Sequence, residues 1–250
     1  EKEMKKRLLI LGMIFTMVVS SAGCGSSSSD NAGKTDQTKQ TADVQDSQKD
    51  TSSSDKSDNK NDTSYKSADE ITMDDLMSHD ETLAEDFEFN DGADEIVIQK
   101  YVGKDPIVVI PDEIDGKKVV GFESAFTLNN NIVAVKIGNN VQEVENSAFS
   151  GCKQLKYVVM GDSVKTIGGR MFAQTNLQEL VLNDGLQKIG QDDSNNVLAP
   201  PSSNCGMDLK IPESVTELHV SEFNLIGKSG SYAEQYANEH ADAGVTFTAE

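Results

Sequence analysis

Residues 132–154 read IVAVKIGNNVQEVENSAFSGCKQ, and this stretch decides the fold because the chain repeats its pattern. The pattern is an alternating apolar triplet, a turn of Gly, Pro, Asn or Asp, a Val-x-x-Ile type segment and an aromatic residue. It recurs from Leu155 (LKYVVMGDSVKTIGGRMFAQTN) and Leu177 (LQELVLNDGLQKIGQ), which gives a period of about 22 to 23 residues. Further copies begin at Ile107, with a small insertion at residues 115–118, and at Leu209. Five stacked units are therefore predicted.

Each unit has apolar residues that only its neighbours can bury. In a short strand, alternate side chains point to opposite faces. Inward positions are then Val135, Val158, Leu180 and Leu209, and after each turn Val141, Val164, Leu186 and Val215 enter the core. The aromatic residues predicted to stack behind them are Phe126, Phe149, Phe172 and Phe223. Because no unit can bury its apolar side alone, the chain is predicted to form a repeat solenoid, a leucine-rich-repeat-like stack of short parallel strands with turns.

The repeats resemble the BspA-type leucine-rich repeat of bacterial surface lipoproteins. The segments that carry the resemblance are IPDEIDGKKV, AFTLNNN, IGNNVQEVENSAFSGCKQL and MGDSVKTIGGRMF. The resemblance covers residues 86–250, because FEFNDGADEIVIQKYVG is similar to the N-terminal hairpin of such domains, with Asp91-Gly92 at its turn. The segment IGKSGSYAEQYANEHADAGVTF is similar to their C-terminal helical cap and the strand after it. Glu222 before Phe223 and the loop of residues 191–206 depart from the pattern.

Residues 1–24 are predicted to be a lipoprotein signal peptide. Lys5, Lys6 and Arg7 precede an apolar run at residues 8–19, which is too short for a bilayer core of about 30 Å and typical of a secretory signal. The stretch Ser21-Ala22-Gly23-Cys24 resembles a lipobox, which implies lipidation of Cys24 and attachment to the membrane through the anchor. The alternative is an ordinary signal peptide with a coincidental cysteine. Both interpretations imply an extracytoplasmic protein. The lipobox further implies a surface-exposed protein that is anchored to the cell membrane by lipid.

Two segments are expected between the anchor and the repeats. Residues 25–69 are rich in Ser, Thr, Asp, Lys, Gln and Asn, so they bury too little to offset the ordering entropy and are predicted to be a disordered tether. Residues 70–85 form an acidic lead-in, in which Ile71, Leu76 and Leu83 indicate a weak helix or a partly docked segment.

Charge and composition exclude several classes of function. The net charge of −20 opposes binding to nucleic acid and to anionic lipid head groups. The three histidines and three cysteines are far apart in sequence, so no metal and no cofactor is expected. Cys152 and Cys205 could form a disulfide outside the cytosol, but two cysteines are not a disulfide framework, and small buried thiols are the commoner case.

The sequence also argues against an enzyme. Gly161-Asp162-Ser163 is reminiscent of a hydrolase nucleophile, but it occupies the turn position of its repeat. The stretch Gly227-Lys228-Ser229-Gly230 lacks the spacing of a phosphate loop, and residues 192–196 lack the ligand spacing of a calcium loop. His79, His219 and His240 have no nucleophile at a useful spacing.

The remaining candidate is a surface. Outward side chains of successive strands form a grid, with one predicted column of Ala134, Tyr157, Glu179 and Asp208, and another of Lys136, Val159, Val181 and Lys210. In this grid Tyr157, Val159 and Val181 make an apolar patch with charged edges at Lys136 and Glu179, as at a protein contact, unless the valines simply suit a strand. The loop of residues 191–206 is a second candidate.

The resemblance implies a protein ligand, such as a matrix or cell-surface protein, and a role in adhesion. The alternative is an envelope scaffold without an exogenous ligand.

Overall fold

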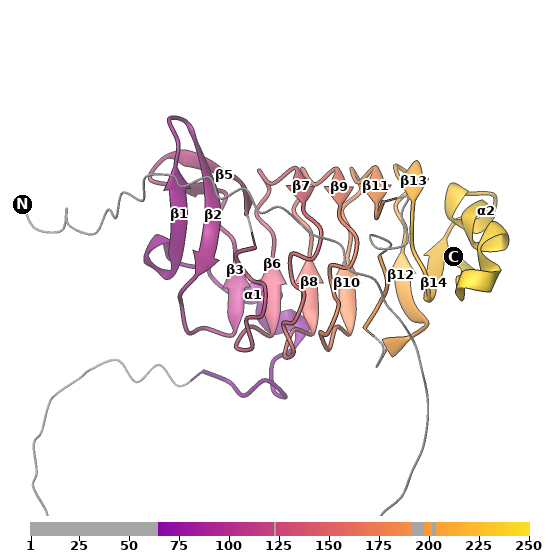
Figure 1. Cartoon of the computed structure of the whole chain (residues 1–250), viewed down its shortest axis with the longest axis horizontal. Coiled ribbons are helices and arrows are strands. Elements are labelled where there is room, and N and C mark those ends of the chain that lie inside the picture. The colour runs from indigo at the N-terminus through magenta and orange to yellow at the C-terminus, as the bar shows by residue number, and fades with distance from the viewer. Residues whose placement is uncertain (1–64, 123, 192–197, 202–203) are drawn as a thin grey trace, which may run out of the picture. The chain divides into compact units, whose positions relative to one another are not determined.

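The computed structural model describes residues 65–122, 124–191, 198–201 and 204–250. The predicted signal peptide, Cys24 and the tether up to residue 64 lie outside the described residues, as do residues 192–197 and 202–203 of the predicted loop. The described part forms four sheets (Figure 1).

The N-terminal sheet, sheet 1, contains the predicted hairpin. Its strands, in spatial order, are β1 (Phe87–Asp91), β2 (Glu95–Tyr101), β5 (Lys117–Phe122) and β4 (Glu113–Ile114). β1 and β2 pair antiparallel, as predicted, although Asp91 still belongs to β1 and the turn follows it. β4 and β5 form a second small hairpin around Asp115 and Gly116, both of which have positive φ.

Two parallel sheets make up the solenoid. Sheet 2 contains β3 (Ile107–Val109), β6 (Ala134–Lys136), β8 (Tyr157–Val159) and β10 (Glu179–Val181). Sheet 3 contains β7 (Glu143–Val144), β9 (Thr166–Ile167), β11 (Lys188–Ile189) and β13 (Glu217–Leu218). Both ladders are parallel and in register from one coil to the next, so the predicted stack of short parallel strands is confirmed.

The core lies between sheets 2 and 3, where the predicted inward residues meet. Val135, Val158 and Leu186 are among the fully or almost fully buried side chains. The rings of Phe126 and Phe149 stack at 5.4 Å, and those of Phe149 and Phe172 at 6.5 Å. This aromatic column continues through the repeats as predicted.

The predicted place of Phe223 in that column is wrong. Phe223 is buried, but it begins β14 and pairs with Met207 instead of closing an aromatic turn. The preceding residue, Glu222, has φ 61°, and its carbonyl accepts from the N–H of Gly206. The fifth unit therefore passes directly from sheet 3 into a new strand.

A C-terminal parallel sheet and a helix complete the described chain. Sheet 4 contains β12 (Met207–Lys210), β14 (Phe223–Gly227) and β15 (Thr246–Ala249). The predicted cap helix is α2 (Tyr232–Glu239), followed by the 3-10 turn η3 (Ala241–Ala243). Ser231 caps α2 by accepting from the N–H of Glu234, and Ala233 and Ala237 are buried.

The lead-in is better ordered than the sequence indicates. It contains α1 (Met73–Ser78) and the 3-10 turn η1 (Ala84–Asp86). Thr72 and Asp75 form a reciprocal capping box at the start of α1. Ile71 and Leu76 are buried, whereas Leu83 is 63% exposed. Lys66, within the last part of the predicted tether, pairs with Asp75 at 2.6 Å.

Close stacking of the coils depends on glycine at one turn. A Cβ placed on Gly161 would overlap the carbonyl oxygen of Gly138 in the preceding coil. In contrast, a Cβ on Gly121 in β5 would meet no atom within 4 Å. The turn after β8 therefore requires glycine for its contact with the neighbouring backbone.

We expect Gly161→Ala to lower the free energy of unfolding by about 1–3 kcal/mol, because the added methyl group must displace backbone. The matched control, Gly121→Ala, should change it by less than about 0.5 kcal/mol. The midpoints of urea unfolding measure both. Equal midpoints for the two variants would contradict a packing role for Gly161.

Candidate binding surface

The predicted grid of outward side chains exists in sheet 2. Because β6, β8 and β10 are parallel and in register, equivalent residues are neighbours across the strands. One column is Ala134, Tyr157 and Glu179, and the other is Lys136, Val159 and Val181. Asp208 and Lys210, predicted to extend these columns, lie on β12, which pairs with β14 in sheet 4.

The lead-in covers one end of this grid. Ile71 and Leu76 form a second apolar cluster with outward residues of β3, β6 and β8, including Ala134 and Val159. Val159 is therefore only 7% exposed, and its predicted place on an open patch is wrong. The strand period indicates that Val159 points away from the main core, but not that a distant segment returns to cover it.

Polar contacts hold the lead-in in place. The side chain of Lys156 is 9% exposed, and its Nζ donates to the carbonyl of Ala68 (2.8 Å) and to Asp69 (3.0 Å). The N–H of Thr82 donates to the carbonyl of Val109 (2.9 Å), and its hydroxyl accepts from the N–H of Val109 (3.0 Å). The contact is thus specific as well as apolar.

The open part of the grid lies at β10. Glu179 and Val181 are exposed, Val181 by 39%, whereas Lys136 and Tyr157 are half-buried. The Tyr157 hydroxyl lies 3.3 Å from the Gln178 side-chain oxygen. Of the five predicted surface residues, Glu179 and Val181 are therefore those most accessible to a partner.

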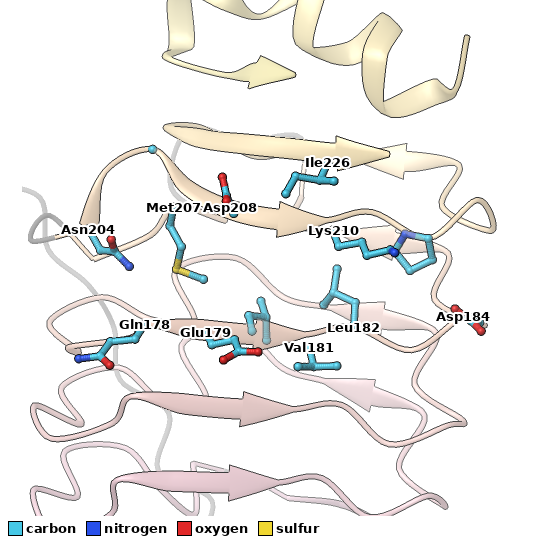
Figure 2. A pocket seen from close by; sticks show the side chains of 13 residues that line it. Gln178, Glu179, Val181, Leu182, Asp184, Asn204, Met207, Asp208, Lys210 and Ile226 are labelled. Carbon is cyan, nitrogen blue, oxygen red and sulfur yellow. The ribbon is translucent and has the colours of Figure 1, made fainter. Parts of the chain in front are cut away.

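These two residues line a cleft of about 710 Å³ between β10 and β12 (Figure 2). Asp208, Lys210 and Ile226 line its other side. The repeat pattern of the sequence does not indicate this cleft. Its only signal in the sequence is the long connection of residues 191–206 between the fourth and fifth units.

The cleft exists because one ladder stops while the other continues. Along sheet 2, the N–H of Ile110 donates to Lys136, that of Ile137 to Val159, and that of Met160 to Val181. No such bond joins Leu182 to β12 within the described part of the chain, and the two strands belong to different sheets. In sheet 3, however, β11 and β13 pair normally.

The rim of the cleft is mainly acidic. Asp208 accepts a hydrogen bond from the Asn224 amide (2.6 Å), and Lys210 is paired with Glu250 (2.8 Å). Neither the Glu179 nor the Asp184 carboxylate has a hydrogen bond or ion pair with the described residues. Three carboxylates thus line a cleft whose one lysine already has a partner.

Cys152 and Cys205 are not joined to each other, so the alternative of a Cys152–Cys205 disulfide does not hold. Cys152 is buried and lies 2.7 Å from the carbonyl oxygen of Phe126, and burial raises the pKa of its thiol to about 11. Cys205 is exposed, and its hydrogen bond to Glu222 raises the pKa of its thiol. Both thiols are therefore protonated at neutral pH.

The other residues considered for chemistry in the sequence, the Gly161–Ser163 stretch and the histidines, make structural contacts. Gly161-Asp162-Ser163 is a turn, as predicted, with the N–H of Val164 donating to the carbonyl of Gly161. His79 pairs with Asp105 (3.3 Å) and His219 with Glu217 (3.1 Å), carboxylates that the sequence pattern does not connect to these histidines.

Among the described residues, no cluster of three His, Cys, Asp or Glu side chains could hold a metal ion, and no helix is long and apolar enough to cross a membrane.

Comparison with known proteins agrees with the repeat geometry. A family model, the BspA type leucine-rich repeat region, matches residues 122–197 in six copies. Residues 122–197 of the solenoid are therefore BspA-type leucine-rich repeats. This repeat type points to a protein-binding role for the domain.

Among solved structures, the BspA-type solenoid is similar to a T. pallidum leucine-rich repeat protein, TpLRR. The identity is 29% and the TM-score 0.49, over 59% of this chain and 71% of that chain. No curated protein sequence matches the chain.

Proposed function

We propose that the protein is a lipid-anchored, non-enzymatic bacterial surface protein whose leucine-rich repeat domain binds another protein, in the manner of an adhesin. The observation that carries the binding role is the open end of the strand grid at β10, where exposed Val181 and Glu179 border the cleft. An apolar residue within a charged rim is typical of a protein contact. The net charge of −20 favours a protein ligand over nucleic acid.

A second candidate is an envelope scaffold without an exogenous ligand. The docking of the lead-in favours it, because Ile71 and Leu76 already occupy much of the outward face of sheet 2. The two functions differ in the partner: an exogenous matrix or cell-surface protein for the adhesin, a protein of the same envelope for the scaffold.

A photo-crosslinking residue at position 181 tests the binding role in intact cells. We expect an adduct with a second protein from position 181, but none from the matched position 145, an exposed residue on the opposite side of the coil. An exogenous partner in the adduct supports adhesion, and an envelope partner supports the scaffold. Equal yields at the two positions, or no adduct from either, would contradict binding at this end of the grid.

The proposed anchor rests on Cys24, which follows the apolar run and precedes the Ser-rich segment. We expect mass spectrometry of the membrane fraction to find acyl chains on Cys24, and Cys24→Ala to release the protein into the medium. Cys205→Ala is the control and should remain in the membrane fraction. An unmodified N-terminal peptide in wild-type cells would refute the anchor.

A further inference from the structure

We infer that the cleft between β10 and β12 binds an extended, basic segment of the partner protein. This inference rests on the proposed protein-binding function and specifies the chemistry of the partner. Four features of the cleft support it: two free strand edges, an unbalanced acidic rim, exposed apolar surface and a suitable size.

The free strand edges come first. β10 is the last strand of sheet 2 and β12 the first strand of sheet 4, and the two run in the same direction (Figure 2). The backbone hydrogen bonds that follow each strand of sheet 2 end at β10, because the Leu182 N–H donates to no described residue of β12. Unpaired backbone groups at a sheet edge are a template for an additional extended chain. The cleft therefore offers main-chain hydrogen bonds that the two strands do not make with each other.

The charges select a cationic segment. The Glu179 carboxylate has no partner among the described residues. The Asp208 carboxylate is held by Asn224, whose side-chain oxygen lies 3.0 Å from the Thr246 hydroxyl and 3.2 Å from that of Thr248. Lys210 is compensated by Glu250. Lysine or arginine of a partner would find carboxylates on both walls. A second copy of this chain, with its net charge of −20, fits such a site poorly.

The apolar surface and the size favour a peptide over a small cation. Val181 is exposed, and Leu182 and Ile226 are half-buried at the cleft, so they can cover the methylene groups of long basic side chains. The cleft volume of about 710 Å³ exceeds the space that one side chain needs. The Asn204 amide, which donates to the carbonyl of Leu177 (3.0 Å), bridges the β12 side to the start of β10.

The test uses peptides of alternating residues, because every second side chain of a strand points to the same face of the sheet. The probe is a fluorescent octapeptide of alternating valine and lysine, and the comparison peptides carry glutamate for lysine or N-methyl groups at alternate amides. Anisotropy titrations with the purified protein should show binding of the lysine peptide only, with affinity that decreases as salt is added.

Two double variants assign the binding to the cleft. We expect Glu179→Gln with Asp208→Asn to weaken binding of the lysine peptide by at least about tenfold. The control, Glu143→Gln with Glu145→Gln, removes two exposed carboxylates outside the cleft. It should change the affinity for the lysine peptide by less than about twofold. Unfolding midpoints equal to wild type establish that both variants are folded.

Several results would overturn the inference. The first is an equal loss of affinity for the lysine peptide in the two double variants. The second is binding of the N-methylated peptide as tight as that of the unmethylated lysine peptide, and the third is no binding of the lysine peptide by the wild type. If the crosslink from position 181 still forms in any of these cases, the protein-binding function stands and only the basic, extended nature of the partner is refuted.

Discussion

Phe149→Ala is expected to lower the free energy of unfolding by about 3–5 kcal/mol, the cost of removing a large ring from a core that cannot close around the space. Phe149 is fully buried. Its ring lies 5.4 Å from that of Phe126, 5.8 Å from Phe122 and 6.5 Å from Phe172. It therefore joins three successive parts of the stack.

Urea unfolding followed by circular dichroism measures this effect. The control is Leu128→Ala in the same type of turn, where the side chain is 67% exposed, and it should cost less than about 1 kcal/mol. In a repeat stack the damage should spread, because each coil is stabilised by its neighbours. A loss below about 1 kcal/mol for Phe149→Ala would mean that the aromatic column does not couple the coils.

The second large effect is expected for Leu76→Ala, which should release the lead-in from sheet 2. Leu76 is fully buried, and α1 has only six residues, too few for a helix that is stable by itself. Its order depends on the apolar cluster with Ile71 and Val159. The substitution should weaken docking by about 2–4 kcal/mol.

Hydrogen exchange read by mass spectrometry separates local release from global unfolding. Peptides from residues 65–86 should lose protection in Leu76→Ala, while those from the turns around Phe126 and Phe149 keep it. Leu83→Ala, at a 63% exposed position of the same segment, should leave protection unchanged. Retained protection of residues 65–86 in Leu76→Ala would show that the polar contacts of Lys156 and Thr82 suffice for docking.

Val159 and Val181 show how far the sequence predicts the surface. They hold the same place in successive repeats, and the strand period assigns both to the outward face, correctly. Their exposures still differ, 7% against 39%, because the lead-in reaches β8 but not β10. That contact joins residues more than 80 positions apart, which no local pattern encodes.

The cleft was unpredictable for a related reason. The sequence shows extra residues between the fourth and fifth units, and its repeat pattern suggests that Asp208 and Lys210 continue the grid. In the structure β14 occupies one edge of β12, and the other edge, which faces β10, does not pair with it. Sequence alternation gives the face of each residue in β12 but not its neighbour.

The interrupted ladder also has a mechanical consequence. β11 and β13 pair between the fourth and fifth units, whereas β10 and β12 do not. Among the described residues, the strand ladders of the solenoid therefore continue across this junction on the sheet 3 side alone. Bending about that side breaks no ladder bond between β10 and β12, because the described residues form none there. The continuous ladder is thus placed as a hinge, and flexing it changes the width of the opening on the opposite side.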